Sequence, residues 1–204
     1  MITAKTRQRL PVAERRALIV EAAGRLFGER GYDGTRLDAV AAAAGVTKPV
    51  LYRHFADKRA LYLALLERHR ADLGSFAGAI PAGGTVEQRL RAVLEVWLDY
   101  VEAHDYAWRM LFRDTGGGEE VRAFRVEVHA RARTVLAGLI AGLAPAPIPQ
   151  RELEPLAELL SMGMASLVLW WIETPGVERE AVLDAIARVW TGVLTPGGAG
   201  GAAA

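Results

Sequence analysis

The sequence predicts an all-α fold of about nine helices, divided between a small N-terminal bundle and a larger C-terminal bundle. Apolar residues recur at three- and four-residue intervals along most of the chain, as on the buried face of a helix. Glycine and proline interrupt this pattern at helical lengths. No segment of useful length alternates apolar and polar residues, so we expect no half-buried strands.

Four helices are expected in the first part of the chain. Pro11 and Gly31 punctuate the two ends of the first helix. Thr35 is the expected N-cap of the second helix, Gly45 ends it, and Asp57 is the expected N-cap of the fourth. The four predicted helices span residues 13–30, 37–44, 47–53 and 58–78.

Five further helices are expected after residue 84. They span residues 86–104, 106–113, 119–143, 151–173 and 178–194. Segments rich in glycine or proline, which interrupt helices, precede or separate them at residues 81–84, 115–118, 144–149 and 174–176. The low-complexity tail, residues 195–204, is expected to be disordered. We therefore expect one domain over residues 1–57 and a second over residues 58–194.

Composition excludes several classes of protein. Of the 204 residues, 51% are hydrophobic and 24% are charged, so the chain can bury a sizeable core. The absence of cysteine excludes disulfides, thiolate metal sites and thiol nucleophiles. The longest uncharged apolar run, residues 159–172, is shorter than the roughly 20 residues that span a membrane. No apolar stretch follows the N-terminal charges, so we expect a cytoplasmic protein without a membrane partner.

Charge is divided unevenly along a chain whose formal net charge is only +1. Residues 1–58 carry 11 basic and 6 acidic side chains, whereas the remainder carries 14 basic and 18 acidic ones. A basic N-terminal region on an acidic body suggests an anionic partner for that region, either nucleic acid or a membrane surface. The excess is small enough to arise by chance, so it does not decide the function alone.

The most informative segment is residues 35–58, which predicts two short helices joined by a tight turn. Gly45 supplies the positive φ of that turn, and the small Ala41 lets the second helix cross closely over the first. With Leu51 six residues after Gly45, this is the spacing of a helix-turn-helix. An outward polar face suited to phosphates and base edges would comprise Thr47, Lys48, Tyr52 and His54. An ordinary helical hairpin with a solvated face is the alternative.

This segment resembles the TetR family of bacterial one-component transcriptional regulators, and the resemblance extends over residues 13–66. The matching positions are Gly31, Tyr32, Thr35, Val40, Ala41, Ala44, Gly45, Val46, Thr47, Lys48, Leu51, Tyr52, His54, Phe55, Lys58 and Leu61. The resemblance implies an N-terminal three-helix helix-turn-helix domain and a C-terminal helical ligand-binding and dimerisation domain. The chain departs from the family at Ala39, often acidic there, and at Pro49, often glycine.

The resemblance also implies roles for individual residues. Family phosphate-contact positions are matched by Thr35, Thr47, Tyr52, His54 and Lys58. The candidates for base-edge contacts are Arg36, Lys48 and Pro49, whereas Val40, Leu51 and Phe55 are expected in the core. Ahead of the first helix, Lys5, Arg7 and Arg9 form either a solvated tail or an arm that enters a minor groove.

A C-terminal cavity is implied as well, and aromatic residues gather in the part of the chain that would form it. The expected lining residues are Trp97, Tyr100, Trp108, Phe112, Val128, Met164 and Trp171. Arg109, His129 and Glu173 are candidates to orient a polar group of the ligand. Because such cavities are mostly apolar, the expected effector is an apolar or aromatic small molecule. Plain core packing is the alternative for each aromatic residue.

The helix over residues 151–173 is apolar on nearly all faces, and a helix of this kind must be buried all round. Together with the final helix, it is expected to form a four-helix homodimer interface. The expected interface residues are Leu160, Gly163, Leu167, Trp170, Ile186, Val189 and Trp190.

These observations predict a repressor that binds a palindromic DNA operator as a homodimer and that an effector releases. The helix over residues 58–78 is expected to be the sole element that touches both domains. No metal or phosphate-binding motif and no nucleophile elbow is present, so neither an enzyme nor a cofactor is expected. The alternative function is a helical ligand-binding or membrane-surface protein whose basic N-terminal region acts only electrostatically.

Overall fold

The computed structural model describes residues 11–195, which contain nine α-helices, one 3-10 helix and no strand. The predicted basic arm (Lys5, Arg7 and Arg9) and nearly all of the predicted tail lie outside this range. The helices are α1 (Val12–Gly34), α2 (Leu37–Ala43), α3 (Lys48–His54), α4 (Lys58–Asp72), η1 (Leu73–Ala79), α5 (Val86–Ala103), α6 (Asp105–Phe112), α7 (Gly118–Leu143), α8 (Gln150–Glu173) and α9 (Arg179–Leu194). The all-α prediction is confirmed.

The three short-range predictions for the N-terminal helices have different outcomes. Helical geometry in α1 breaks at Gly31, whose φ is 68°, and Asp57 caps α4 by accepting a hydrogen bond from the Ala60 amide. The prediction that Thr35 caps α2 is wrong, because Arg36 occupies the N-cap position. The single helix expected over residues 58–78 is instead α4 followed by the 3-10 helix η1.

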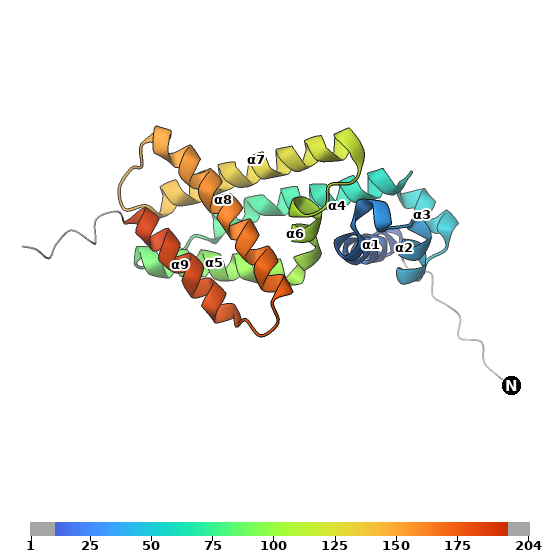
Figure 1. Ribbon diagram of the computed structural model, residues 1–204, viewed down its shortest axis with the longest axis horizontal. Coiled ribbons are helices and arrows are strands. Elements are labelled where there is room, and N and C mark those ends of the chain that lie inside the picture. The colour runs from blue at the N-terminus through green and yellow to red at the C-terminus, as the bar shows by residue number, and fades with distance from the viewer. Residues whose placement is uncertain (1–10, 196–204) are drawn as a thin grey trace, which may run out of the picture.

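The helices form an elongated molecule with α1, α2 and α3 at one end and the α8–α9 pair toward the other (Figure 1). Helices α4 and α7 run along the molecule between these two ends. Two hydrophobic clusters result, one around α1–α4 and one formed by η1, α5 and α7–α9. The N-terminal cluster also takes in Tyr106, Ala107 and Met110 from α6.

Helix α6 packs directly on α1, which the sequence analysis did not predict. Gly24 and Gly28 permit this approach, because an added Cβ at either position would lie 2.6 Å from the nearest atom of Tyr106. At Gly28 the backbone Cα of Tyr106 is only 2.9 Å from that position, so a side chain there would push the two helices apart. Two small residues one turn apart thus determine how closely the second domain rests on the first.

Among the helices of residues 11–195, α8 alone has the length and apolar composition that would allow it to cross a membrane. Only one face of it is buried within the chain, including Leu160, Met164 and Val168. The core of a single chain therefore leaves part of α8 uncovered, and its burial by a partner subunit stays a prediction. Its outer face carries the exposed side chains of Leu159, Met162 and Trp170.

Candidate functional sites

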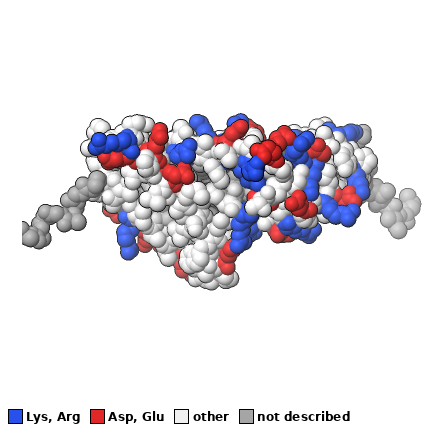
Figure 2. Space-filling model, turned by 45° about the horizontal axis from the view of Figure 1, so that its top comes forward, with Lys and Arg blue, Asp and Glu red and all other residues white. Residues whose placement is uncertain are grey.

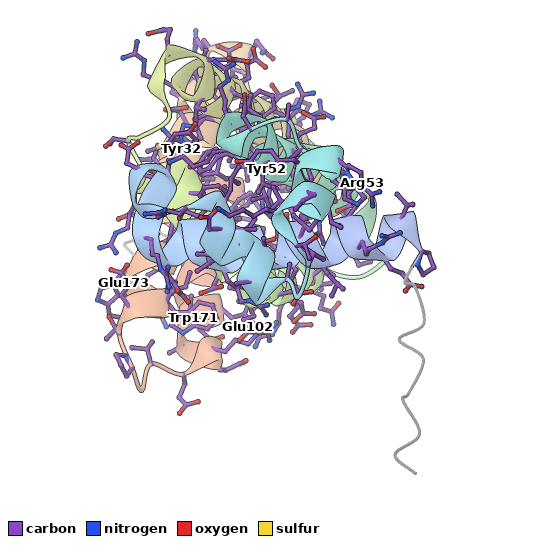
Figure 3. The ribbon with its side chains drawn as sticks, turned by 90° about the vertical axis from the view of Figure 1, so that its right-hand side faces the viewer. Tyr32, Tyr52, Arg53, Glu102, Trp171 and Glu173 are labelled. Atoms are coloured by element: carbon purple, nitrogen blue, oxygen red, sulfur yellow. The ribbon has the colours of Figure 1, made fainter. Side chains whose placement is uncertain are left out.

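Helix α3 lies on an exposed end of the molecule (Figure 3). The preceding turn contains Gly45 at φ 65°, as the sequence predicted. Val40, Leu51 and Phe55 are buried in the N-terminal cluster and attach α3 to its neighbours. The outward side chains of α3 and its N-cap are Thr47, Lys48, Pro49, Tyr52 and Arg53, all of which are exposed.

The cations near the start of α3 share an acidic neighbour. The Lys48 ammonium lies 2.6 Å from the Asp38 carboxylate, and the Arg36 guanidinium lies 3.7 Å from it. The hydrogen bond from Lys48 lowers the pKa of Asp38 below its usual value. Asp38 therefore orients Lys48 and offsets part of its charge on the exposed surface.

Two residues predicted to contact phosphate are used inside the protein. Thr35 is only 1% exposed, and its hydroxyl donates to the backbone oxygens of Leu26 and Gly31. The prediction that the Thr35 side chain contacts DNA is therefore wrong for this conformation. The Lys58 ammonium donates to the backbone oxygens of Tyr32 and Thr35 and lies 4.4 Å above the Tyr32 ring. Lys58 thus fixes the segment between α1 and α2.

A basic cluster that the sequence analysis missed joins the start of α1 to the end of α3. Burial lowers the pKa of His54, and the nearby charges of Arg15, Arg53 and Arg16 lower it further. The Arg16 guanidinium lies 4.9 Å above the ring of Phe55, which brings the two helices together. Within residues 11–195, no carboxylate forms an ion pair with these three arginines. Their separation of nearly 40 residues in the chain left no local pattern by which to find them.

The C-terminal domain encloses a cavity of about 80 Å³ between η1 and helices α5–α9. Five of the seven predicted lining residues do line it: Trp97, Trp108, Phe112, Val128 and Met164. His129, a predicted polar candidate, lines it too. Its pKa is lowered by burial, which outweighs the opposite effects of the Leu111 backbone and Glu158. Leu73 and Phe76 of η1 also contribute to the wall.

The remaining predictions for this cavity are wrong. The Tyr100 hydroxyl instead lies 2.5 Å from Nδ1 of the buried His69 and donates to Asp72. The Trp171 indole donates to the backbone oxygen of Val177, outside the cavity. Neither of the two charged candidates lines it, because Arg109 pairs with Asp105 on the same helix and Glu173 pairs with Arg113. The partners of Tyr100 and Glu173 are distant in the chain, whereas Asp105 lies one helical turn from Arg109.

A buried polar network connects the loop after α6 to the N-terminal domain. The Asp114 carboxylate accepts from the Tyr32 amide at 2.7 Å, the Tyr62 hydroxyl at 2.9 Å and the Gly116 amide at 2.9 Å. The Arg125 guanidinium lies 3.5 Å from Asp114 and also donates to Tyr62. Burial raises the pKa of Tyr62, so its hydroxyl stays protonated and can donate. This network ties the end of α1 to the loop that follows α6.

Figure 2 shows a broad area with few charged side chains over the α8–α9 part of the molecule, whereas charged side chains gather elsewhere on the visible face. A groove between the two helices is lined by Leu159, Leu160, Gly163, Met164, Leu167, Ala185, Ile186, Val189, Trp190 and Val193. Leu159 is 68% exposed and Val189 is 58% exposed, whereas Trp190 is only 2% exposed. Leu160, Ile186 and Trp190, predicted as interface residues, thus belong to the core of their own chain.

Models of known families match both parts of the chain. Residues 19–65 match the model described as bacterial regulatory proteins of the tetR family, and residues 86–192 match the tetracyclin repressor-like C-terminal domain. The second match alone covers more than half of the chain. The protein belongs to the TetR family.

Curated TetR-family relatives include two from Mycolicibacterium smegmatis. The chain is 40% identical to the HTH-type transcriptional activator FasR over 127 residues, which cover 62% of this chain and 58% of FasR. It is 27% identical to the HTH-type transcriptional regulator EthR over 187 residues, which cover 87% of this chain and 84% of EthR. The FasR alignment thus leaves a substantial part of each protein unmatched.

Solved TetR-family structures share the whole architecture. A regulator from Streptomyces coelicolor has a TM-score of 0.71 and 25% identity, covering 90% of this chain and 82% of its own. A regulator from Rhodococcus sp. RHA1 has a TM-score of 0.69 and 28% identity, covering 91% and 98%. The two domains are those of a DNA-binding transcriptional regulator with a C-terminal ligand-binding domain. The relatives are regulators rather than enzymes.

Proposed function

We propose that this protein is a cytoplasmic transcriptional repressor without enzymatic activity that binds a palindromic operator as a homodimer and is released by a small apolar effector. TetR-family regulators bind DNA and small-molecule effectors and act as dimers. The observation that carries the proposal is the position of α6, which lies between the cavity and α1. We keep residues 1–57 as the DNA-binding domain and 58–194 as the ligand-binding and dimerisation domain.

The proposed DNA surface combines the outward face of α3 with the basic cluster. Lys48, with Arg36 and Pro49, would meet base edges, since a cation oriented by Asp38 presents a defined donor to a major groove. Phosphate contacts would come from Thr47, Tyr52 and His54 and from the arginines found in the structure, Arg15, Arg16 and Arg53.

The proposed subunit contact is the exposed α8–α9 face. In an isologous dimer, the two subunits bury the same patch against each other. A helix pair with one apolar outer face suits such an interface. Gly163 and the groove beside it leave room for a partner side chain. Gly163, Leu167, Trp170 and Val189, predicted from the sequence, remain in the proposed interface, joined by Leu159 and Met162.

The proposed switch runs through α6 as well as α4, which corrects the expectation that one helix touches both domains. Trp108, Leu111 and Phe112 line the cavity, while Tyr106 and Met110 of the same helix are buried against the N-terminal domain. The cavity of about 80 Å³ is smaller than the ~300–1,000 Å³ of pockets for drug-sized ligands. An effector would therefore displace the lining residues of α6 and η1.

Displacement of α6 would shift the position of α3, the proposed DNA-contacting helix, through two sets of contacts. The first is direct packing of Tyr106 on Gly24 and Gly28 of α1. The second is the Asp114 network, which holds the Tyr32 amide beside the segment that leads into α2. A coupling free energy of about 1–3 kcal/mol is expected, and operator DNA should weaken effector binding by the same factor.

Selection of bound sequences from random DNA tests the proposed function. A two-fold site is expected, with half-sites about 34–36 Å apart or a multiple of that. The Lys48→Ala variant should lose about 1–3 kcal/mol of specific binding and relax preference at one position per half-site. Arg53→Ala should instead weaken binding to all sequences and reduce its salt dependence. Binding to anionic vesicles without selective DNA binding would refute the proposal and favour a membrane-surface role.

Substitutions on the α8–α9 face test the dimer. Val189→Arg and Leu159→Arg should produce folded monomers with weak operator binding, because both side chains are exposed in the single chain. Val126→Arg on α7 is the matched control, since Val126 is 62% exposed but lies outside the α8–α9 groove. Sedimentation of the Val189→Arg variant as a stable dimer would place the interface elsewhere.

A further inference from the structure

One wall of the cavity is a continuous series of aromatic rings. The Trp108 and Phe112 rings lie parallel, with centroids 5.7 Å apart and planes inclined by 6°. The His129 ring also lies parallel to Phe112, with centroids 4.7 Å apart and planes inclined by 9°. Trp97 meets Trp108 edge to face, at 5.6 Å. Rings packed in this way resist rotation, so their nitrogen atoms have defined positions.

Three nitrogen atoms of the lining residues are buried without a hydrogen-bond partner among residues 11–195. They are Nε1 of Trp108, Nε2 of His129 and Nε1 of Trp190, a residue that is 2% exposed. An unpaired buried donor destabilises a protein, and native structures usually pair such groups or use them for a ligand. The two indoles can only donate, whereas neutral imidazole either donates or accepts at Nε2.

The described cavity lining carries no formal charge. It contains no lysine, arginine, aspartate or glutamate, and Ser161 and His129 are its polar side chains apart from the indoles. Burial lowers the pKa of His129, so the imidazole is neutral near pH 7. A carboxylate or an ammonium group in this cavity would therefore lose its hydration without gaining an opposite charge, which is strongly unfavourable.

We infer that the effector is an uncharged, largely apolar molecule bearing a hydroxyl or carbonyl oxygen that hydrogen-bonds to Trp108 Nε1 and His129 Nε2. This inference rests on the proposed function for the identity of the site. The oxygen accepts from an indole N–H, and the imidazole either donates to it or accepts from its hydroxyl. Contact with Trp108 also places the polar group of the effector on α6, the helix that joins the cavity to the DNA-binding domain.

Matched compounds test this inference by calorimetry on the full-length protein. The hydrocarbon, alcohol, methyl ketone and carboxylate are compared on cyclohexyl, octyl and naphthyl frameworks. On the framework that binds best, the alcohol or ketone should bind at least about tenfold more tightly than the hydrocarbon and the carboxylate. A tightest-binding carboxylate, or no binding by any member of the series, would overturn the inference.

Variants then separate hydrogen bonding from shape. Trp108→Phe and His129→Phe each remove a nitrogen but keep a ring, so the preference for the oxygenated compound should shrink to within about threefold. His129→Gln should restore part of it, because the amide can donate and accept. Trp171→Phe is the control, since the Trp171 indole donates to the backbone oxygen of Val177 and does not line the cavity. An unchanged preference in both ring variants would contradict the inference.

The inference and the proposed function can fail separately. If the protein selects a palindromic operator and a hydrocarbon releases it as well as the matched alcohol or ketone does, the proposed function stands and the inference is wrong. If no DNA sequence is selected, the proposed function is wrong, while the preference between matched compounds still measures the chemistry of the cavity.

Discussion

The N-terminal and C-terminal clusters are both helical and apolar, but they differ in how completely they are packed and bonded. Around Phe27, Tyr32 and Tyr62, aromatic rings pack with centroids 4.9–6.2 Å apart. The charged pair beside them, Asp114 and Arg125, has several hydrogen bonds. The C-terminal cluster instead surrounds a cavity and leaves three lining nitrogens unpaired. The two regions therefore differ in whether their buried polar groups have partners, and we expect the N-terminal cluster to resist deformation better than the C-terminal cluster.

The largest expected effect comes from breaking the bonded network. Arg125→Met should lower the free energy of unfolding by about 3–5 kcal/mol, because it leaves the buried Asp114 carboxylate without its cation. Denaturant titration measures this change. Arg122→Met on the same helix is the control, since its pair with Glu119 is exposed and should contribute at most about 1 kcal/mol. Equal losses of unfolding free energy in the two variants would mean that the buried network contributes no more to stability than the exposed ion pair does.

The next effect concerns the contact between the two regions. Gly28→Ala should destabilise the protein by about 1–3 kcal/mol, because the added Cβ meets the Tyr106 backbone. The substitution should also reduce the coupling free energy between effector binding and operator binding, because it moves α6 away from α1. Gly138→Ala on α7 is the matched control: its Cβ meets nothing within 4 Å, so helix propensity should stabilise it by up to about 1 kcal/mol. Urea titrations of both variants check the opposite signs.

A pH-dependent effect is expected at His69, which lies between the two clusters. Burial lowers the pKa of His69 to about 3, and the neighbouring His104 and Arg68 act in the same direction. Between pH 6.5 and pH 3 the unfolded chain therefore binds a proton that the folded protein does not. Stability should fall as the pH decreases through this window, by up to about 1.4 kcal/mol per unit.

The variant His69→Gln isolates this contribution. Between about pH 7.5 and pH 5, its loss of unfolding free energy should be smaller than that of the natural protein by about 2 kcal/mol. Chemical denaturation at both pH values provides the measurement. Identical pH dependence in the two proteins would show that His69 binds a proton without unfolding.

The smallest expected effect on stability is in the C-terminal cluster. Ala132→Leu places three additional carbon atoms toward the cavity and should change the free energy of unfolding by no more than about 1–2 kcal/mol. It should nevertheless abolish release of DNA by the effector while leaving operator affinity within a few-fold. Fluorescence anisotropy with labelled operator would check both. An intact response would mean that the effector binds outside this cavity.

Much of the helical architecture follows from local chemistry, which the sequence contains directly. The sequence pattern predicted each α-helix but not the 3-10 helix η1, and the positive φ at Gly45 and the Asp57 cap depend on residues only a few positions apart. The resemblance to the TetR family also implied that Val40, Leu51 and Phe55 lie in the core, and all three are buried. The spacing of the helix-turn-helix also led to the correct family, because that domain is built from consecutive residues.

Only the tertiary structure decided which side chains are free to meet a partner. Thr35 sits in a polar segment, yet its hydroxyl is satisfied by the α1 backbone. Trp190 and Val189 are adjacent in the chain, but one is buried and the other exposed because α9 turns one face inward. The approach of Arg15 to α3, the packing of α6 on α1 and the unpaired nitrogens of the cavity depend on contacts between distant segments. Local patterns determine where helices form, whereas the packing of their faces determines which groups remain available for function.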